Sequence, residues 1–139
     1  RRDLPNSLKS YKNIYDDLLK DLKPHDFYYA ISNVSEWQER DEEFFMKNHV
    51  EKRSKMRINT KLIFTDSQLA QSRKKTEKNF NEEIKIITKE TEIHLDFVIT
   101  PYKLDMFQLH EPLVALVIEN QAMILAQKEI FELLWNKSE

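Results

Sequence analysis

The most regular hydrophobic pattern of the chain lies near its C-terminus, in residues 113–135. A short run rich in β-branched residues at 114–118 predicts a buried strand. After this run, apolar residues recur at the three- and four-residue spacing of an amphipathic helix. The expected core-facing stripe of the helix is Met123, Ala126, Ile130, Phe131 and Leu134. Leu125, Leu133 and Trp135 fall outside the stripe, so we expect them to form an interface with a second subunit.

The remaining chain alternates between helical and strand-like patterns. Apolar residues at helical spacing predict a first helix over residues 5–23. Further helices are expected at 36–57, opened by a capping box of Ser35 and Gln38, and at 67–78. Strand-like runs occupy residues 27–31, 61–65, 84–88, 92–100, 104–109 and 114–118. This order predicts an α/β fold, a single domain over residues 1–139 with a mixed sheet of about five to six strands flanked by helices.

Composition narrows the functions that are open to this chain. Its 139 residues are 40% hydrophobic and 33% charged, which is typical of a globular domain that folds without disulfides. The lack of cysteine excludes thiolate metal sites, and the lack of glycine excludes glycine-rich phosphate-binding loops and nucleophile elbows. A net charge of −2 provides no field that would attract nucleic acid. No apolar run is long enough to span a membrane, so we expect no membrane contact. The lack of cysteine favours a cytoplasmic domain, and we expect no cofactor.

A basic helical face is the first candidate for ligand binding. His49 and Arg53 are four residues apart and therefore share one face of the 36–57 helix, and Lys61 on the next strand extends the positive charge. Such a patch suits an anionic or polyhydroxyl ligand. The alternative is a solvated basic helix end, since charged side chains on helices are mostly exposed.

A second candidate is the pair His94 and Asp96 in the 92–100 strand. Residues two apart point to the same face of a strand, and a histidine beside a carboxylate can transfer protons or bind a ligand. No third metal-ligating residue accompanies the pair, so a metal site is not expected. A structural or surface role is the alternative.

A third group of charges lies at Arg73, Lys74 and Lys75 in the 67–78 helix. Sites that grip single-stranded nucleic acid combine basic residues with stacking aromatic residues, and none are interleaved here. We therefore expect this basic run to be a solvated face.

Two blocks of the sequence carry motifs that point to a family. The first block contains a phenylalanine, a basic pair, an isoleucine and a strand that ends at an acidic turn: Phe45, Lys52-Arg53, Ile58, residues 61–64 and Asp66. The second runs from residues 117–120 to the closing Phe-Glu-Leu-Leu-Trp at 131–135. Both blocks resemble the C-terminal, phospholipase D-like effector domain of TrmB-family transcriptional regulators, found chiefly in archaea and also in bacteria. The resemblance extends from about residue 4 to the end and departs from the family at Arg57, where a glycine is usual.

This resemblance implies a phospholipase D-like half domain that binds a small-molecule effector, in some relatives a sugar, and forms a homodimer. Such domains relay ligand binding to a winged-helix DNA-binding domain, which is not in this chain, and contact DNA only through it. Phospholipase D enzymes use a His-x-Lys-x4-Asp signature, whereas here His94 is followed by Asp96 in place of lysine and by Pro101 in place of aspartate. We therefore expect no enzyme activity. The alternatives are a phosphodiesterase of phospholipase D ancestry that uses His94, and a protein interaction module without a small ligand.

Overall fold

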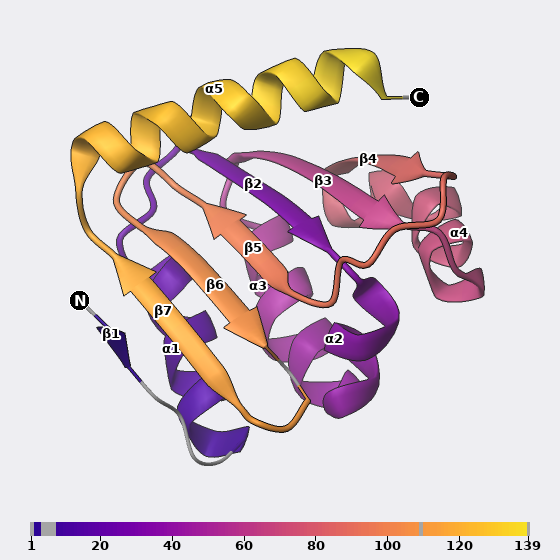
Figure 1. Ribbon diagram of the computed structural model, residues 1–139, viewed down its shortest axis with the longest axis horizontal. Helices are drawn as coiled ribbons and strands as arrows, with labels where there is room; N and C mark the ends of the chain where they lie inside the picture. The colour runs from indigo at the N-terminus through magenta and orange to yellow at the C-terminus, as the bar shows by residue number, and fades with distance from the viewer. Residues whose placement is uncertain (1, 4–7, 109, 139) are drawn as a thin grey trace.

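A seven-stranded mixed sheet forms the centre of the fold (Figure 1). The computed structural model describes residues 2–3, 8–108 and 110–138. In spatial order the strands are β1 (Arg2–Asp3), β7 (Val114–Ile118), β6 (Leu104–Gln108), β5 (Asp96–Ile99), β2 (Phe27–Ser32), β3 (Asn59–Thr65) and β4 (Glu82–Ile87). Strands β2, β3 and β4 run parallel, and the other neighbours pair antiparallel. The predicted α/β fold with a mixed sheet flanked by helices is confirmed, and the short β1 adds one strand to the expected number.

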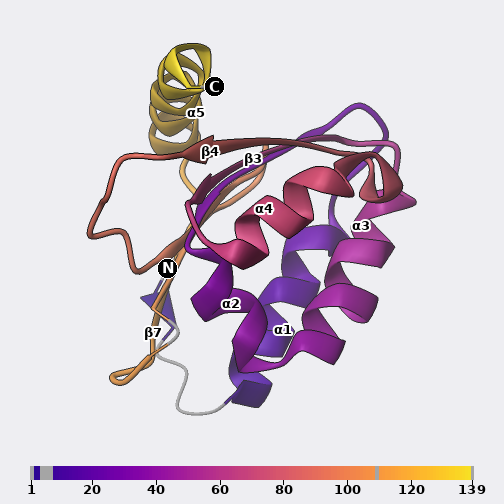
Figure 2. The ribbon, with the colours of Figure 1, turned by 90° about the vertical axis from the view of Figure 1, so that its right-hand side faces the viewer.

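Helices cover the two faces of the sheet unequally, as Figure 2 shows. One face carries α1 (Leu8–Lys20), α2 (Val34–Arg40), the π-helix η1 (Phe44–Val50), α3 (Glu51–Ser54) and α4 (Gln68–Lys75). A short 3-10 helix, η2 (Glu77–Phe80), leads from α4 to β4. Among the helices that the structure describes, α5 (Gln121–Lys137) is the one on the other face. Within the ranges that the structure describes, no helix is long and apolar enough to cross a membrane.

Strand alternation divides the apolar residues between two cores. In β2, Tyr28 points into the larger core beneath α1 to α4, and Tyr29 points into the smaller core beneath α5. Tyr15 of α1 and Phe45 of η1 meet in the larger core with their ring centroids 5.0 Å apart. In the smaller core, Phe131 of α5 stacks on Tyr29 at 4.6 Å. The same strand therefore contacts both helical layers.

The face of α5 that packs on the sheet differs from the predicted stripe. Ile124, Phe131 and Trp135 are buried, whereas Met123 and Ile130 are 53% and 54% exposed. Met123 and Ile130 each precede a core position by one residue, which turns them about 100° away from the sheet. Trp135 packs in the smaller core of its own chain, with its ring 5.9 Å from that of Phe131. The prediction that Trp135 lies off the core-facing stripe is therefore wrong.

The predicted 36–57 helix is interrupted. Helix α2 ends just before Asp41, whose φ and ψ angles of −160° and 85° are not helical. The Asp41 carboxylate accepts a hydrogen bond from the Phe44 amide at 3.2 Å. The chain then resumes as η1 and α3. Helix α2 also begins earlier than predicted, because its N-cap is Asn33 instead of Ser35. Gln38, which was expected to close the capping box, turns into the protein interior.

Other predicted boundaries also move. The 92–100 strand is reduced to β5, and residues 91–95 before it are irregular. The 67–78 helix ends at Lys75 and is followed by η2. Residue 5, the predicted start of the first helix, and residue 109, the predicted end of β6, lie outside the described residues.

The turns of this glycine-free chain use other residues in the left-handed region. His25, Arg57 and Asn81 have φ angles of 74°, 55° and 58°. A residue with a Cβ pays about 1–2 kcal/mol for this conformation, and asparagine adopts it more readily than most. Arg57 lies where the resembled family usually has glycine, and its carbonyl accepts a hydrogen bond from the His25 amide at 3.0 Å. The helix-to-strand turn thus forms without glycine.

Candidate functional site

A buried carboxylate lies between two arginines on the helical side of the sheet. Glu82 is the first residue of β4, and its side chain is fully buried. Arg73 of α4 donates from Nη2 to both carboxylate oxygens of Glu82, at 2.9 and 2.7 Å. Arg53 of α3 donates from its own Nη2 to Glu82 Oε2. We call Arg53, Arg73 and Glu82 the ion cluster; it places two positive charges and one negative charge out of contact with water.

Aromatic rings and one amide complete the surroundings of the two guanidinium groups. Arg53 lies over the Tyr28 ring, 4.6 Å from its centroid, and Arg73 lies over Phe64 at 5.5 Å. Gln38 of α2 accepts a hydrogen bond from Arg73 Nη1 through its Oε1 at 3.1 Å. Burial lowers the pKa of Arg73, and the carboxylate beside it acts in the opposite direction. The ion cluster and Gln38 therefore join α2, α3 and α4 to the edge strand β4.

His49 is buried next to the ion cluster. Its Nε2 lies 2.8 Å from the Tyr28 hydroxyl, and its ring packs edge-on against Tyr15 at 5.1 Å. Burial, reinforced by the positive charges of Arg53 and Arg73, holds the pKa of His49 well below its usual value. The imidazole is therefore neutral at pH 7 and serves as part of the core.

Asp96 is a second buried carboxylate in the same region. It accepts hydrogen bonds from the hydroxyls of Tyr15 and Ser32. Burial raises the pKa of Asp96 to about 6 although both hydroxyls favour the ionised form. Asp96 also lines a narrow cavity with Arg53 and Arg73, in which only about 10 Å³ is open to the centre of a water molecule. That space is sufficient for about one water and excludes a metabolite.

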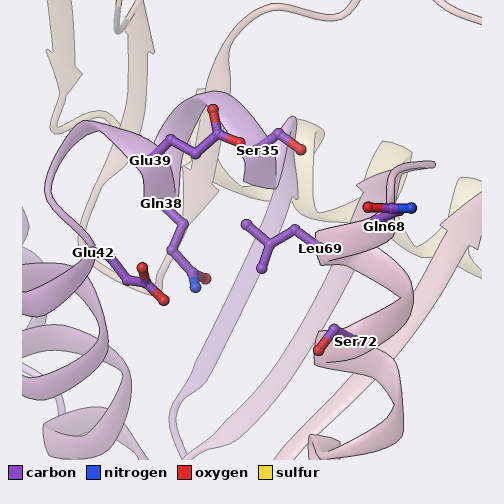
Figure 3. Close-up of a pocket in the computed structure, with 7 residues that line it drawn as sticks. All are labelled: Ser35, Gln38, Glu39, Glu42, Gln68, Leu69 and Ser72. Atoms are coloured by element: carbon purple, nitrogen blue, oxygen red, sulfur yellow. The ribbon is translucent and has the colours of Figure 1, made fainter.

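A much larger space lies on the surface above the ion cluster. It is a groove of about 600 Å³ between α2 and α4, which follow the carboxyl ends of the parallel strands β2 and β3 (Figure 3). Ligands of open α/β sheets commonly bind outside such strand ends. The lining residues are Ser35, Gln38, Glu39, Glu42, Gln68, Leu69 and Ser72. Gln38 is the residue that the groove shares with the bonds of the ion cluster.

The structure separates the residues that were predicted to form a basic ligand patch. His49 and Arg53 share a helical face, but this face points into the core, so the prediction of a solvated helix end fails for both. Lys61 lies on the opposite side of the sheet. Its ammonium is 5.4 Å from the centroid of the Trp135 ring and 5.9 Å from that of Tyr29. Lys61 therefore belongs to the α5 side and does not meet His49 or Arg53.

His94 and Asp96 also occupy different places. Because β5 starts at Asp96, His94 is not on the strand; it is exposed, with Nδ1 2.9 Å from Glu36 Oε1 and Nε2 3.4 Å from Glu92 Oε2. Hydrogen bonds to Glu36 and then to Glu92 raise the pKa of His94. Asp96 points into the core instead. In the part of the chain that the structure describes, no group of three or more histidine and acidic side chains is arranged to hold a metal ion.

Three residues of this region were missed by the sequence patterns. Arg73 was assigned to a solvated face, but it lies one turn from the buried Ala70 and shares its inward direction. Glu82 alternates with Ile84 in β4, a period-two signal that places it on the core side. Gln38 follows the buried Trp37, and nothing in its spacing marks it as a partner of Arg73.

Comparison with known proteins shows what this fold is similar to. No family model matches the sequence, and no curated protein matches it. Among solved structures, the chain is similar to TrmBL2, an archaeal chromatin protein described as showing a novel mode of DNA binding, with a TM-score of 0.61. The similarity covers 100% of this chain and 52% of TrmBL2, at 15% sequence identity. The likeness is one of fold, and the chain spans about half the length of that protein.

We predict that Glu82→Gln lowers the free energy of unfolding by about 3–5 kcal/mol, because it removes the negative charge that is paired with two buried guanidinium groups. Glu83→Gln is the matched control, since Glu83 is the exposed neighbour on the same strand, and it should change stability by less than about 0.5 kcal/mol. Equilibrium urea denaturation measures both. Equal effects at the two positions would contradict a structural role for the ion cluster.

A second prediction concerns pH. The pKa of Asp96 is raised from 3.8 to about 6 on folding, so the folded state holds a proton that the unfolded state has lost between about pH 4 and pH 6. Asp96 therefore makes the protein less stable as pH rises through this window, by about 3 kcal/mol in all. Asp96→Asn removes this dependence.

The quantity to measure is the difference in unfolding free energy between Asp96→Asn and the natural protein at a series of pH values. It should shift in favour of the variant from pH 4 to pH 6 and stay constant above that range. His49 acts in the opposite direction, because its lowered pKa makes the protein less stable as pH falls below 6.5, but it is present in both proteins. Parallel pH curves would show that the pKa of Asp96 is the same in the folded and unfolded states, and would contradict the prediction.

Proposed function

We propose that this chain is a non-catalytic ligand-sensing and dimerisation domain of a TrmB-like transcriptional regulator. Its effector is a small polar molecule that binds in the groove between α2 and α4. Its contact with DNA is made through a winged-helix domain outside this chain. The observation that carries the proposal is the groove of about 600 Å³, a size typical of small-molecule sites, with the buried Gln38 in its wall.

Two independent likenesses support the class of regulator. The motifs at residues 45–66 and 117–135 resemble the TrmB effector domain. The fold of the whole chain resembles part of an archaeal chromatin protein. Both are consistent with a regulatory domain and neither depends on catalytic residues.

A route from the groove to α5 supports a sensing role. Gln38 in the groove wall holds Arg73, and Arg73 holds Glu82 at the start of β4. Lys85 lies three residues further along β4, and its Nζ donates a hydrogen bond to the carbonyl oxygen of Trp135 in α5 at 2.8 Å. Strand β4 thus has a polar bond to each helical layer. A ligand that binds two arrangements of Gln38 with different affinity would shift this strand and, with it, the end of α5.

Blocking the groove should abolish ligand binding. We expect a screen of sugars, amino sugars, nucleotides and phosphorylated metabolites to find a compound that raises Tm, since a ligand at about one hundred times its Kd adds about 2.7 kcal/mol. Ser72→Trp, which places a bulky ring in the groove, should remove the effect. Asn79→Trp, on the exposed η2, is the control and should retain it. If no compound raises Tm, the chain is better described as an interaction module without a small ligand.

The phosphodiesterase alternative has weak support in the geometry. His94 lies between the carboxylates of Glu36 and Glu92, which would repel a phosphodiester, and Asp96 stands where the signature requires lysine. Neither Arg53 nor Arg73 can take the role of that lysine, because both are buried against Glu82. Hydrolysis of bis(p-nitrophenyl) phosphate that disappears in His94→Ala would overturn the non-catalytic assignment.

Dimerisation is proposed to use the sheet face that carries α5. Leu125 and Leu133 are 56% and 66% exposed and lie two turns apart on one flank of α5. Beside α5, a row of partly buried apolar residues crosses the sheet in register: Ile31, Phe97, Met106 and Leu116. A second copy of the chain would bury the helix flank and this row together. Trp135, predicted for the interface, is left out because its own chain already buries it.

Charge placed on the exposed flank of α5 should separate the subunits. We expect the natural chain to have the mass of a dimer in light scattering coupled to size-exclusion chromatography. The double variant Leu125→Lys and Leu133→Lys should be a monomer with unchanged circular dichroism, since both side chains are exposed in the single chain. Asn79→Lys is the control for added charge. A monomeric natural chain, or a double variant that remains dimeric, would contradict this interface.

A further inference from the structure

The groove between α2 and α4 has a distinct electrostatic character. Two of its lining residues, Glu39 and Glu42, are acidic, and none is basic. Throughout residues 2–3, 8–108 and 110–138, neither carboxylate forms an ion pair. The nearby Asp41 is different, because it is paired with Lys12 at 2.8 Å. The groove therefore presents two carboxylates that have no countercharge of their own.

Gln38 adds a hydrogen-bond donor with a fixed direction. An arginine has donors only, so the Gln38 amide must turn its oxygen toward Arg73, and this leaves Nε2 as the free end. No described residue accepts a hydrogen bond from that Nε2, although the residue is only 3% exposed. Gln38 lines the groove, and its side chain extends between α2 and α4 (Figure 3). Gln38 Nε2 is not one of the solvent-inaccessible atoms without a partner, so water reaches it and a ligand oxygen can take the place of that water.

The rest of the lining is neutral. Ser35 and Ser72 provide hydroxyls that both donate and accept, and Gln68 provides a second amide. Leu69, drawn opposite Gln38 in Figure 3, offers a small apolar surface. A ligand for this lining needs a positive group for the carboxylates, an oxygen for Gln38 Nε2, and further hydroxyls for the serines.

We propose that the groove recognises a small amine that also carries hydroxyl groups, the chemistry of an amino sugar or an amino alcohol. This inference rests on the proposed sensing function and specifies the ligand class of that site. The ammonium group binds on the α2 side of the groove, where Glu39 and Glu42 supply the negative charge, a hydroxyl oxygen accepts from Gln38 Nε2, and the carbon skeleton lies against Leu69. The proposal replaces the anionic ligand suggested by the sequence, because Arg53, which was predicted to bind it, is buried and already paired with Glu82.

Anionic and neutral ligands fit this groove less well. A phosphate would lie beside two carboxylates with no cation in the lining, and like charges that share a site repel each other. A neutral sugar could make the same hydroxyl contacts but would lack the charge pairing. Exposed ion pairs are individually weak, so the charge of the two carboxylates should favour the amine over the neutral sugar by about tenfold.

The experiment is isothermal titration of the full chain with glucosamine, glucose and glucose 6-phosphate, at low salt and at a pH where the amine is protonated. Glucosamine should bind about ten times more tightly than glucose, and glucose 6-phosphate should bind most weakly. The double variant Glu39→Gln and Glu42→Gln should reduce the affinity for glucosamine to that for glucose. Glu43→Gln is the matched control, because Glu43 is exposed next to the groove without lining it.

Two results would overturn the inference. One is equal or tighter binding of glucose or glucose 6-phosphate, with no effect of the double variant; the groove would then sense a ligand of another class. The other is the absence of any binding by glucosamine. Both results differ from a failure of the sensing function itself. That function fails if no compound in the wider screen raises Tm, or if the rise in Tm persists in Ser72→Trp.

Discussion

The burial of Glu82 is the constraint on which the helical side of this protein depends. A carboxylate removed from water is tolerated only when it is paired and hydrogen-bonded, and Glu82 meets this requirement with Arg53 and Arg73. These arginines come from different helices, so the ion pair fixes α3 and α4 against the first residue of β4. Gln38 extends the same network to α2. The distance between α2 and α4, and therefore the width of the groove, follows from a few polar bonds rather than from apolar packing alone.

The sheet separates this polar side from an apolar one. Alternation in β2 and β3 sends Tyr28 and Phe64 toward the ion cluster, and Tyr29 toward α5. One side combines buried charges with an open groove, which suits binding of a polar ligand. The other has one helix with an exposed apolar flank, which suits contact with another protein surface. The two proposed activities thus occupy opposite faces, and Lys85 of β4 connects the edge strand to the C-terminal end of α5.

Sequence patterns predict this fold well in the short, mostly apolar strands of the sheet. The 114–118 strand coincides with β7, and the 27–31 and 61–65 strands lie within β2 and β3. The patterns fail in α5, since a helix with apolar residues on several sides does not reveal which side meets the sheet. They fail most at the site, because Glu82 is 29 and nine positions from its two arginines and only the folded chain brings them together. Charged helix residues are normally exposed, so the usual expectation for Arg53 and Arg73 is the wrong one here.

The central claim, that two charged guanidinium groups are buried against one carboxylate, is tested most directly by the exchange of arginine Nε–H protons in solution. Heteronuclear NMR resolves these signals, and exposed Arg57 provides an internal reference for fast exchange with water. The structure predicts that the Nε–H signals of Arg53 and Arg73 are protected, since both atoms are inaccessible to solvent. Protection should disappear in Glu82→Gln. If Arg53 and Arg73 exchange as fast as Arg57 in the natural protein, the ion cluster is not buried and the account of the groove above it is wrong.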